Sequence, residues 1–319
     1  MNDCLHGGPD ALGVPLFDFS TNSNACGPCL HALAAVQQAD ATRYPDPQYT
    51  ALRAQLADFH GVDAARVLLA ASASEFIHRI SALHRGQGVC LPQHHYGDYA
   101  QAAQAWGLVP ADAVQAQLLW ACEPSSPLGQ AHPGLAALVD GLQPTQTLVL
   151  DCAYAPLRLE GTPSLNAAQM DRVWHMWTPN KALGLTGIRA AYVIAPLGVD
   201  SAPLQALCPS WPVGAHGVAM LQAWCQPATQ AWLAQSLETL RAWKARQLIL
   251  CRTLGWECVP SEANFFCARP PGEDVPLRLQ RLRARGVKLR DAASFGLGGY
   301  VRLGVLAPGG QDALGRGNV

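Results

Sequence analysis

Short apolar runs and longer mixed stretches alternate along the first two thirds of the chain. Helical spacing of apolar residues predicts helices within residues 29–39 and 43–61, and residues 66–84 predict a strand that runs into a third helix. Further apolar runs of strand length, separated by helical or loop stretches, lie at residues 88–93, 117–124, 147–154, 172–178 and 190–196. This alternation is typical of an α/β fold in which helices cover both faces of a mostly parallel sheet. We therefore expect ligands at the strand ends.

The pattern changes after residue 195. A proline-rich connection occupies residues 195–214, and residues 230–254 predict a long helix studded with arginine. Beyond it, residues 263–270 predict a strand, residues 277–291 a helix followed by a strand, and residues 299–308 another strand. These elements predict a second, smaller α/β domain.

The chain is accordingly divided into three parts. Residues 1–42 are an N-terminal segment that we expect to pack with the small domain, residues 43–212 are the large domain, and residues 213–319 are the small domain. Residues 309–319 contain several glycines, and we expect them to be frayed.

Composition narrows the class of partner. The 319 residues are 50% hydrophobic and 14% charged, which is enough for a sizeable buried core. A formal net charge of -1 gives no field of one sign, so we expect neither nucleic acid nor an acidic membrane as a partner. The start of the chain lacks the features of a signal peptide and no apolar run is long enough to span a bilayer, so we expect a cytoplasmic protein that binds small molecules.

The eleven cysteines are odd in number and lie mostly inside apolar segments, which argues against a disulfide framework. Cys26 and Cys29 have the spacing of thioredoxin-type redox sites, and a predicted helix follows them. The strand that should precede such a site is missing, because the preceding residues are polar turn formers. We interpret the pair as an ordinary helix start, with a redox role as the alternative.

One of the three lysines lies in an unusual context. Lys244 belongs to a predicted amphipathic helix and Lys288 to a predicted strand, so both are interpreted as surface residues. Lys181 follows a Thr-Pro-Asn turn and precedes Gly-Leu-Thr-Gly, where glycines would let the backbone approach a bound group, and Arg189 follows as a fixed cation. Such a lysine can form a Schiff base with an aldehyde cofactor; a buried structural salt bridge is the alternative.

Two further features have the chemistry of a pyridoxal phosphate site. Asp151 ends an apolar strand, and its carboxylate would suit the protonated ring nitrogen of that cofactor, with Tyr154 near the ring hydroxyl; a helix cap is the alternative. Small residues between a strand and a helix, including Ser72 and Ser74, would expose N–H groups to a phosphate. The order of phosphate loop, Asp, Tyr, Lys and Arg is more specific than any one of these features.

Five motifs in the chain are similar to motifs of a known family: "HGG" at 6–8, "DFSTN" at 18–22, "RYPDP" at 43–47, "TPNKALGLTGIRAAY" at 178–192 and "YVRLGV" at 300–305. The chain resembles fold-type I pyridoxal-phosphate enzymes, the aminotransferase superfamily, from about His6 to Arg302. Within that superfamily the motifs most resemble L-threonine-O-3-phosphate decarboxylases of cobalamin biosynthesis, with histidinol-phosphate aminotransferases as the nearest relatives.

The resemblance implies the fold-type I fold, pyridoxal 5'-phosphate as cofactor in the large domain, and a homodimer with shared active sites. Lys181 would be the Schiff-base lysine, Asp151 the partner of the ring nitrogen and Tyr154 a ligand of the ring hydroxyl. The phosphate ligands would be Thr178, Arg189, the peptide nitrogens of Ala73 and Ser74, and Tyr44 from the other subunit. Tyr96 would stack on the ring. His6, Arg290 and Arg302 would bind the substrate, and Arg302 would hold the substrate carboxylate. No metal site is expected.

The chain departs from the family pattern in three places. Ser126 replaces the usual asparagine that touches the ring oxygen, and "AASASE" at residues 70–75 replaces a Gly-Asn-Gly start, which requires that Ala70 and Ser72 avoid positive φ. The chain is also short at its C-terminus, where the family has a closing helix.

We expect decarboxylation of L-threonine O-3-phosphate to (R)-1-aminopropan-2-ol O-phosphate. The alternatives are an aminotransferase of the histidinol-phosphate type and a non-catalytic relative that binds a phosphorylated amino acid.

Overall fold

The computed structural model describes residues 7–272 and 274–317. Its large sheet has seven strands in the order β2-β8-β7-β6-β5-β3-β4, and all neighbours are parallel except at β8, which runs antiparallel to both β2 and β7. The strands are β2 (Val67–Ala70), β3 (Gly88–Cys90), β4 (Val109–Pro110), β5 (Leu118–Cys122), β6 (Thr147–Asp151), β7 (Trp174–Trp177) and β8 (Ala191–Ile194). The predicted, mostly parallel α/β sheet is confirmed.

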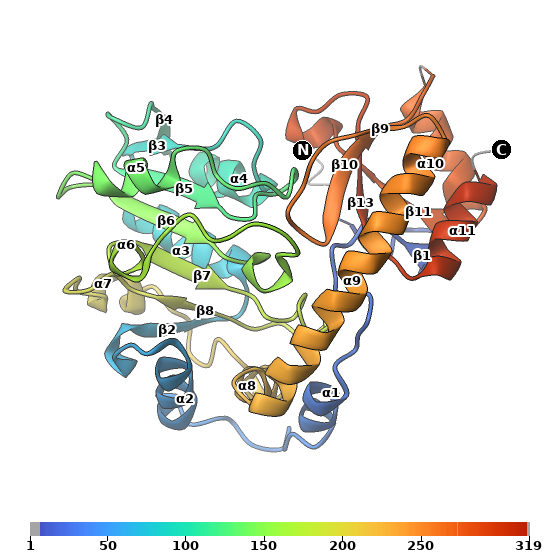
Figure 1. Ribbon diagram of the computed structural model, residues 1–319. Helices are drawn as coiled ribbons and strands as arrows, with labels where there is room; N and C mark the ends of the chain where they lie inside the picture. The colour runs from blue at the N-terminus through green and yellow to red at the C-terminus, as the bar shows by residue number, and fades with distance from the viewer. Residues whose placement is uncertain (1–6, 273, 318–319) are drawn as a thin grey trace.

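Helices cover both faces of this sheet, as Figure 1 shows. Successive residues of a strand point to opposite faces, so Leu118 and Trp120 of β5 pack with α3 and α4, whereas Leu119 and Ala121 pack with α5. Burial on both faces explains why these strands are continuous apolar runs. The helices around the sheet are α2 (Thr50–His60), α3 (Ala73–Leu83), α4 (Gly97–Ala105), α5 (Leu135–Asp140), α6 (Ala167–Met170) and α7 (Ala202–Ala206), with single turns η1 (Ala64–Arg66) and η2 (Ala155–Leu157).

The smaller unit contains an antiparallel sheet in the order β12-β13-β10-β9 and a parallel pair, β1 and β11. Its strands are β1 (Phe17–Asp18), β9 (Glu257–Cys258), β10 (Phe265–Arg269), β11 (Val287–Lys288), β12 (Arg290–Asp291) and β13 (Val301–Gly304). Its helices are α10 (Val275–Ala284), α11 (Pro308–Gly317) and the turn η3 (Ala293–Phe295). Pairing of β1 with β11 brings the first described part of the chain to this unit.

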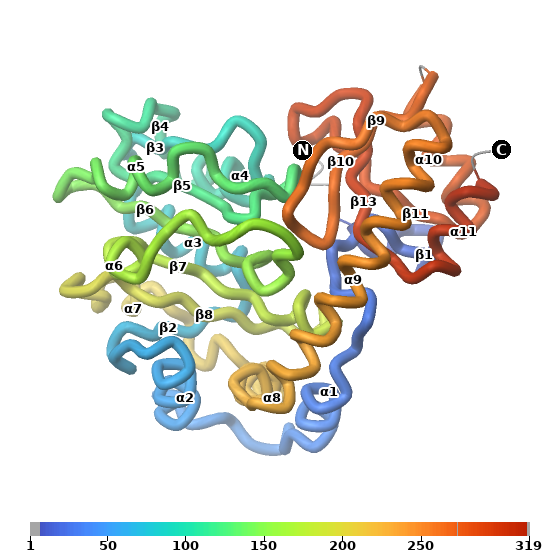
Figure 2. Tube along the Cα trace, viewed as in Figure 1, coloured from blue at the N-terminus to red at the C-terminus, as the bar shows by residue number. Residues whose placement is uncertain are grey.

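Three further helices complete the fold: α1 (Leu30–Gln37), α8 (Ala215–Trp224) and α9 (Pro227–Thr253). Figure 1 shows α9 running from the large sheet to the small one. Figure 2 shows the N-terminal segment running from the small unit past α1 to α2. α8 shares an apolar core with α1, α2 and β8, so the packing continues across residue 213. The domain boundary at that position and the assignment of residues 1–42 stay predictions.

The C-terminal residues differ from the prediction of a frayed tail. They form α11, and Leu314 is fully buried in the small unit's core. Arg246 of α9 donates hydrogen bonds to Gln311 and Asp312, which fixes α11 against α9. The buried positions Gly310, Gln311 and Leu314 follow helical spacing, and their packing and the hydrogen bonds of Gln311 outweigh the low helix propensity of the glycines.

Lys244 also differs from prediction, because it is 2% exposed rather than a surface residue. Its ammonium group donates to Glu160 at 2.9 Å and to the carbonyl oxygen of Ser261, so its charge is paired. Lys288 is largely buried as well, and it pairs with Asp10 and donates to the carbonyl oxygen of Gly8. A helical pattern does not show which polar residue faces a second domain.

Candidate active site

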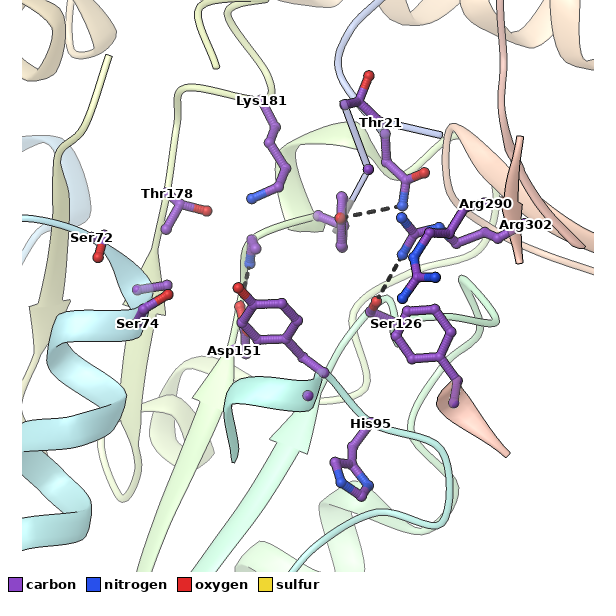
Figure 3. A pocket seen from close by; sticks show the side chains of 18 of the residues that line it. Thr21, Ser72, Ser74, His95, Ser126, Asp151, Thr178, Lys181, Arg290 and Arg302 are labelled. Carbon is purple, nitrogen blue, oxygen red and sulfur yellow. Dashed lines mark hydrogen bonds between the residues drawn. The ribbon is translucent and has the colours of Figure 1, made fainter. Parts of the chain in front are cut away.

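A cavity of about 1090 Å³ lies where the large sheet, the N-terminal segment and the small unit meet. Figure 3 shows its arrangement: Ser72, Ser74 and Thr178 lie on one side, Arg290 and Arg302 on the other, and Lys181 and Asp151 between them. Most of the predicted site residues therefore line one cavity. They are Ala73, Ser74, Tyr96, Ser126, Asp151, Tyr154, Thr178, Lys181, Arg189, Arg290 and Arg302.

Two predicted residues do not line it. Tyr44 is 77% exposed on the surface and stacks on Trp211, with 4.5 Å between the ring centroids. This position is open to a second subunit, and its predicted role across a dimer stays a prediction. His6 lies outside the described residues.

One end of the cavity offers hydrogen-bond donors to an anion. The carboxyl end of β2 leads into α3, whose first turn starts at Ala73, and the first N–H groups of a helix have no partner within it. Ser72 caps this helix in an extended conformation, φ -167°, so the glycine-free loop needs no positive φ there. Thr178 adds a buried hydroxyl that has no hydrogen-bond partner among the described residues, and Arg189 adds a cation.

The hydroxyl of Ser74 has a different partner. It donates to Asp98 of α4, a buried carboxylate, so it is committed to this side chain. The backbone N–H of Ser74 remains the group that can bind a phosphate.

Lys181 follows β7 in a turn held by the N-terminal segment. The N–H of Asn24 donates to the carbonyl oxygen of Lys181 at 2.9 Å, and the N–H of Cys29 donates to that of Leu183 at 2.8 Å. Gly27 lies so close to Gly184 that a Cβ on Gly27 would come within 2.8 Å of the Gly184 Cα. Gly184 therefore serves packing within the protein rather than approach to a bound group.

These contacts also account for the Cys-Gly-Pro-Cys sequence, which supports the lysine turn. Burial raises the pKa of the Cys26 thiol, opposite to the shift of a thioredoxin-type nucleophile. All ten described cysteines are free thiols. The structure favours the helix-start interpretation over the redox alternative.

Lys181 is available for chemistry. Its ammonium group lies 5.5 Å from the ring centroid of Tyr154 and makes no hydrogen bond or ion pair with the described residues. The structural salt bridge considered as its alternative role is thus absent from residues 7–272 and 274–317. The Tyr154 hydroxyl accepts a hydrogen bond from Asn22 at 3.2 Å.

Asp151 lies at the carboxyl end of β6 and is 5% exposed. Its Oδ1 accepts the N–H of Ala153 at 2.8 Å, and its Oδ2 accepts the hydroxyl of Tyr99 at 2.6 Å. Burial raises its pKa, against the opposing effects of these two hydrogen bonds and of Lys181. A buried carboxylate beside an open cavity is suited to a cationic ring nitrogen.

The opposite end of the cavity carries two arginines. Arg290 of β12 and Arg302 of β13 are directly opposite in the antiparallel pair, so both point to the same face. Arg302 donates to the carbonyl oxygen of Ser20 at 3.1 Å and to Ser126 Oγ at 3.4 Å, while its buried Nε has no hydrogen-bond partner among the described residues. Phe295 lies against both guanidinium groups, at 4.9 and 5.4 Å. This end suits a second anion.

These donors fit pyridoxal 5'-phosphate. A helix N-terminus with the unpartnered Thr178 hydroxyl would hold the phosphate, Asp151 the ring nitrogen, Tyr154 the ring hydroxyl, and Lys181 the aldehyde carbon. The described residues contain no cluster of His, Cys, Asp or Glu that could hold a metal ion. They also contain no helix that could cross a membrane.

Comparison with known proteins decides the family. The model of "aminotransferase class I and II" matches residues 14–115 and 108–316. The chain belongs to this family. A histidinol-phosphate aminotransferase of Jannaschia sp. (strain CCS1) is 28% identical to the chain, over 91% of this chain and 86% of its own.

Solved structures show the same fold. Histidinol-phosphate aminotransferase from Sinorhizobium meliloti in complex with pyridoxal-5'-phosphate superposes with a TM-score of 0.80 at 22% identity, covering 93% of this chain and 88% of its own. L-threonine-O-3-phosphate decarboxylase from Porphyromonas gingivalis gives 0.79 at 20% identity, covering 95% and 98%. This chain is a pyridoxal-phosphate-dependent enzyme of fold type I, as predicted.

The prediction of threonine-phosphate decarboxylation is wrong. The Jannaschia protein and three other curated relatives, at 26 to 29% identity, are histidinol-phosphate aminotransferases. The longest of the motifs behind that prediction, residues 178–192, carries Lys181 and other residues expected to bind the cofactor, which both kinds of enzyme share, so it does not separate the two reactions.

Three residues without a predicted role contact predicted site residues directly: Asn22 contacts Tyr154, Asp98 contacts Ser74, and Tyr99 contacts Asp151. Asn22 ends the quoted "DFSTN" motif, and the other two follow Tyr96 on α4.

Proposed function

We propose that this enzyme is an aminotransferase of the histidinol-phosphate type, which moves an amino group from a phosphorylated amine to a 2-oxo acid. The observation that carries the proposal is the pair of anion-binding ends on either side of Lys181 and Asp151. One end would hold the cofactor phosphate, which leaves the arginine end for an anionic substrate. The aminotransferase names of the curated relatives support the choice of reaction.

The arginine end suits both partners of such a reaction. A guanidinium group can donate two parallel hydrogen bonds to a phosphate or to a carboxylate. Arg302 would therefore bind the phosphate of histidinol phosphate in one half-reaction and a carboxylate of the oxo acid in the other. Phe295 and the hydrogen bond to the Ser20 carbonyl oxygen would keep the Arg302 guanidinium group in one orientation while the two substrates exchange.

The residues around the cofactor have separate tasks. When bound, pyridoxal 5'-phosphate supplies an aldehyde for the substrate amine and a ring that accepts the electron pair released at Cα. Lys181 Nζ would take the proton from Cα of the substrate and deliver it to the aldehyde carbon of the cofactor, because no other described lysine lines the cavity. Asp151 would hold the proton on the ring nitrogen, and Asn22 and Tyr154 would orient the ring hydroxyl.

The active form is proposed to be a homodimer in which Tyr44 of each subunit reaches the cofactor phosphate of the other. Its exposure, together with that of Trp211, leaves this aromatic pair without cover in the single chain. Two shared sites per dimer would result.

A transamination assay tests the proposal. Purified protein loaded with cofactor is given L-histidinol phosphate with and without 2-oxoglutarate, and the glutamate formed is measured. We expect glutamate that depends on both substrates, and much weaker turnover of L-histidinol, which lacks the phosphate for the arginine end. Absence of glutamate in the presence of both substrates, or equal turnover of histidinol and its phosphate, would contradict the proposal.

A further inference from the structure

Tyr99 makes a contact that the family motifs did not indicate. It lies on α4, is fully buried, and does not line the cavity. Its hydroxyl donates to Oδ2 of Asp151 at 2.6 Å across the gap between α4 and β6. Its ring lies flat on Trp120 of β5, with 4.4 Å between centroids and 15° between planes. The stacking fixes the ring, and the ring fixes where the hydroxyl points.

Asp151 depends on this contact for half of its hydrogen bonds. Oδ1 is held by Ala153 and Oδ2 by Tyr99, and no described residue forms an ion pair with the carboxylate. The other titratable groups that act on it are Lys181, which favours its charge, and Asp98, which opposes it. A donor to a carboxylate favours its ionised form, so removal of the Tyr99 hydroxyl would favour the neutral acid.

We propose that Tyr99 is a positioning residue that holds the Asp151 carboxylate ionised and oriented toward the ring nitrogen of the cofactor. The inference rests on the role of Asp151 in the proposed function. The Tyr99 ring also contacts the rings of His95 and Tyr96, which line the cavity, with 6.3 and 5.8 Å between centroids. Phenylalanine would keep these ring contacts, so loss of the hydroxyl separates them from the contact with Asp151. The stacking on Trp120 could be made equally well by phenylalanine, whereas the hydroxyl donates to Asp151 and also contacts the thiol of Cys122.

The test compares two ligands of the apoenzyme that differ at one atom. Pyridoxal 5'-phosphate has the basic ring nitrogen, and its 1-deaza analogue has C–H in that position. In Tyr99→Phe the stacking is kept and the hydroxyl is lost. We expect affinity for pyridoxal 5'-phosphate to fall about tenfold, the size of one hydrogen bond to a charged group, with affinity for the analogue changed less than about twofold.

Tyr192→Phe is the matched control. Tyr192 is also fully buried in the large sheet, and its hydroxyl contacts His60 at 2.8 Å and Trp224 at 3.1 Å, away from the cavity. A general loss of stability would lower both affinities together. We expect the ratio of the two affinities in Tyr192→Phe to equal that of the wild type.

Two further measurements keep the inference open to refutation. In the Asp151→Asn background, Tyr99→Phe should change neither affinity further, because the group it acts through is gone. Replacement of Tyr99 by 3-fluorotyrosine keeps the shape and makes the phenol a stronger donor, so it should raise the preference for pyridoxal 5'-phosphate even if Tyr99→Phe does not fold.

An unchanged ratio of affinities in both Tyr99 variants, or an equal fall for both ligands, would overturn the inference. Because these are binding measurements, they give a result whether or not histidinol phosphate is the substrate. A failed transamination assay with a shifted ratio would reject the proposed function and keep the role of Tyr99.

Discussion

Arg302→Lys separates a substrate-binding role from a structural one, because it keeps the charge and removes the planar fork. Arg302 is 7% exposed and is fixed by Ser20 and by the rings of Phe265 and Phe295. A lysine can place one ammonium group near the same position, but it cannot donate two parallel hydrogen bonds to one anion.

The expected loss is one charge-assisted hydrogen bond, about 1.5 to 3 kcal/mol, which corresponds to a roughly ten- to hundredfold fall in kcat/KM. Stability should change less. The bond to the Ser20 carbonyl oxygen is worth about 1 kcal/mol, so the Tm should fall by only about 2 to 4 °C. The absorbance of the bound cofactor should be unchanged, because Arg302 lies at the end of the cavity away from Thr178.

Arg269→Lys provides the control. Arg269 belongs to the same small sheet and stacks on Tyr300 at 4.5 Å, but it is exposed and outside the cavity. We expect its kcat/KM to stay within about twofold of the wild type, the level of an isolated surface contact. An unchanged kcat/KM in Arg302→Lys, or an equal fall in Arg269→Lys, would refute the assignment.

Three other predictions address the cofactor, the assembly and the fold. Asp151→Asn should lower kcat on the order of a hundredfold and cofactor affinity much less, since an amide cannot hold the ring proton; wild-type turnover would exclude this role. Light scattering should show a dimer, and a fully active monomer would contradict the role of Tyr44. His175 is buried and His60 is partly buried, and the loss of solvent lowers their pKa values to about 3 and about 4, respectively, from 6.5. The unfolded chain therefore binds protons more readily, and Tm should fall as pH drops from about 6.5 toward 4. His175→Asn, which keeps an acceptor for Trp177, should reduce that slope.

Much of the site could be predicted because its residues follow strands. Asp151 and Lys181 come directly after apolar runs, and the carboxyl ends of parallel strands meet at one edge of a sheet, so local sequence placed both near one ligand. Arg290 and Arg302 were found only through resemblance, because nothing in a short strand shows that it faces a cavity in another part of the protein.

The missed residues depend on contacts between distant segments. Asn22 and Tyr154 are 132 positions apart, and Tyr99 and Asp151 are 52 apart. No periodicity records such pairs. Lys244 was misplaced for the same reason, since its partners Glu160 and Ser261 belong to segments that α9 meets only after the two units pack together.

The most direct test of the account is to find which lysine carries the cofactor. Lys244 and Lys288 are held by Glu160, Asp10 and backbone carbonyl oxygens, whereas Lys181 lies in the cavity without such partners among the described residues. Borohydride reduction of the purified protein, followed by peptide mapping, should therefore label Lys181 alone, and Lys181→Ala should remove the label. A label on Lys244 or Lys288, or none on a protein that contains the cofactor, would contradict the account.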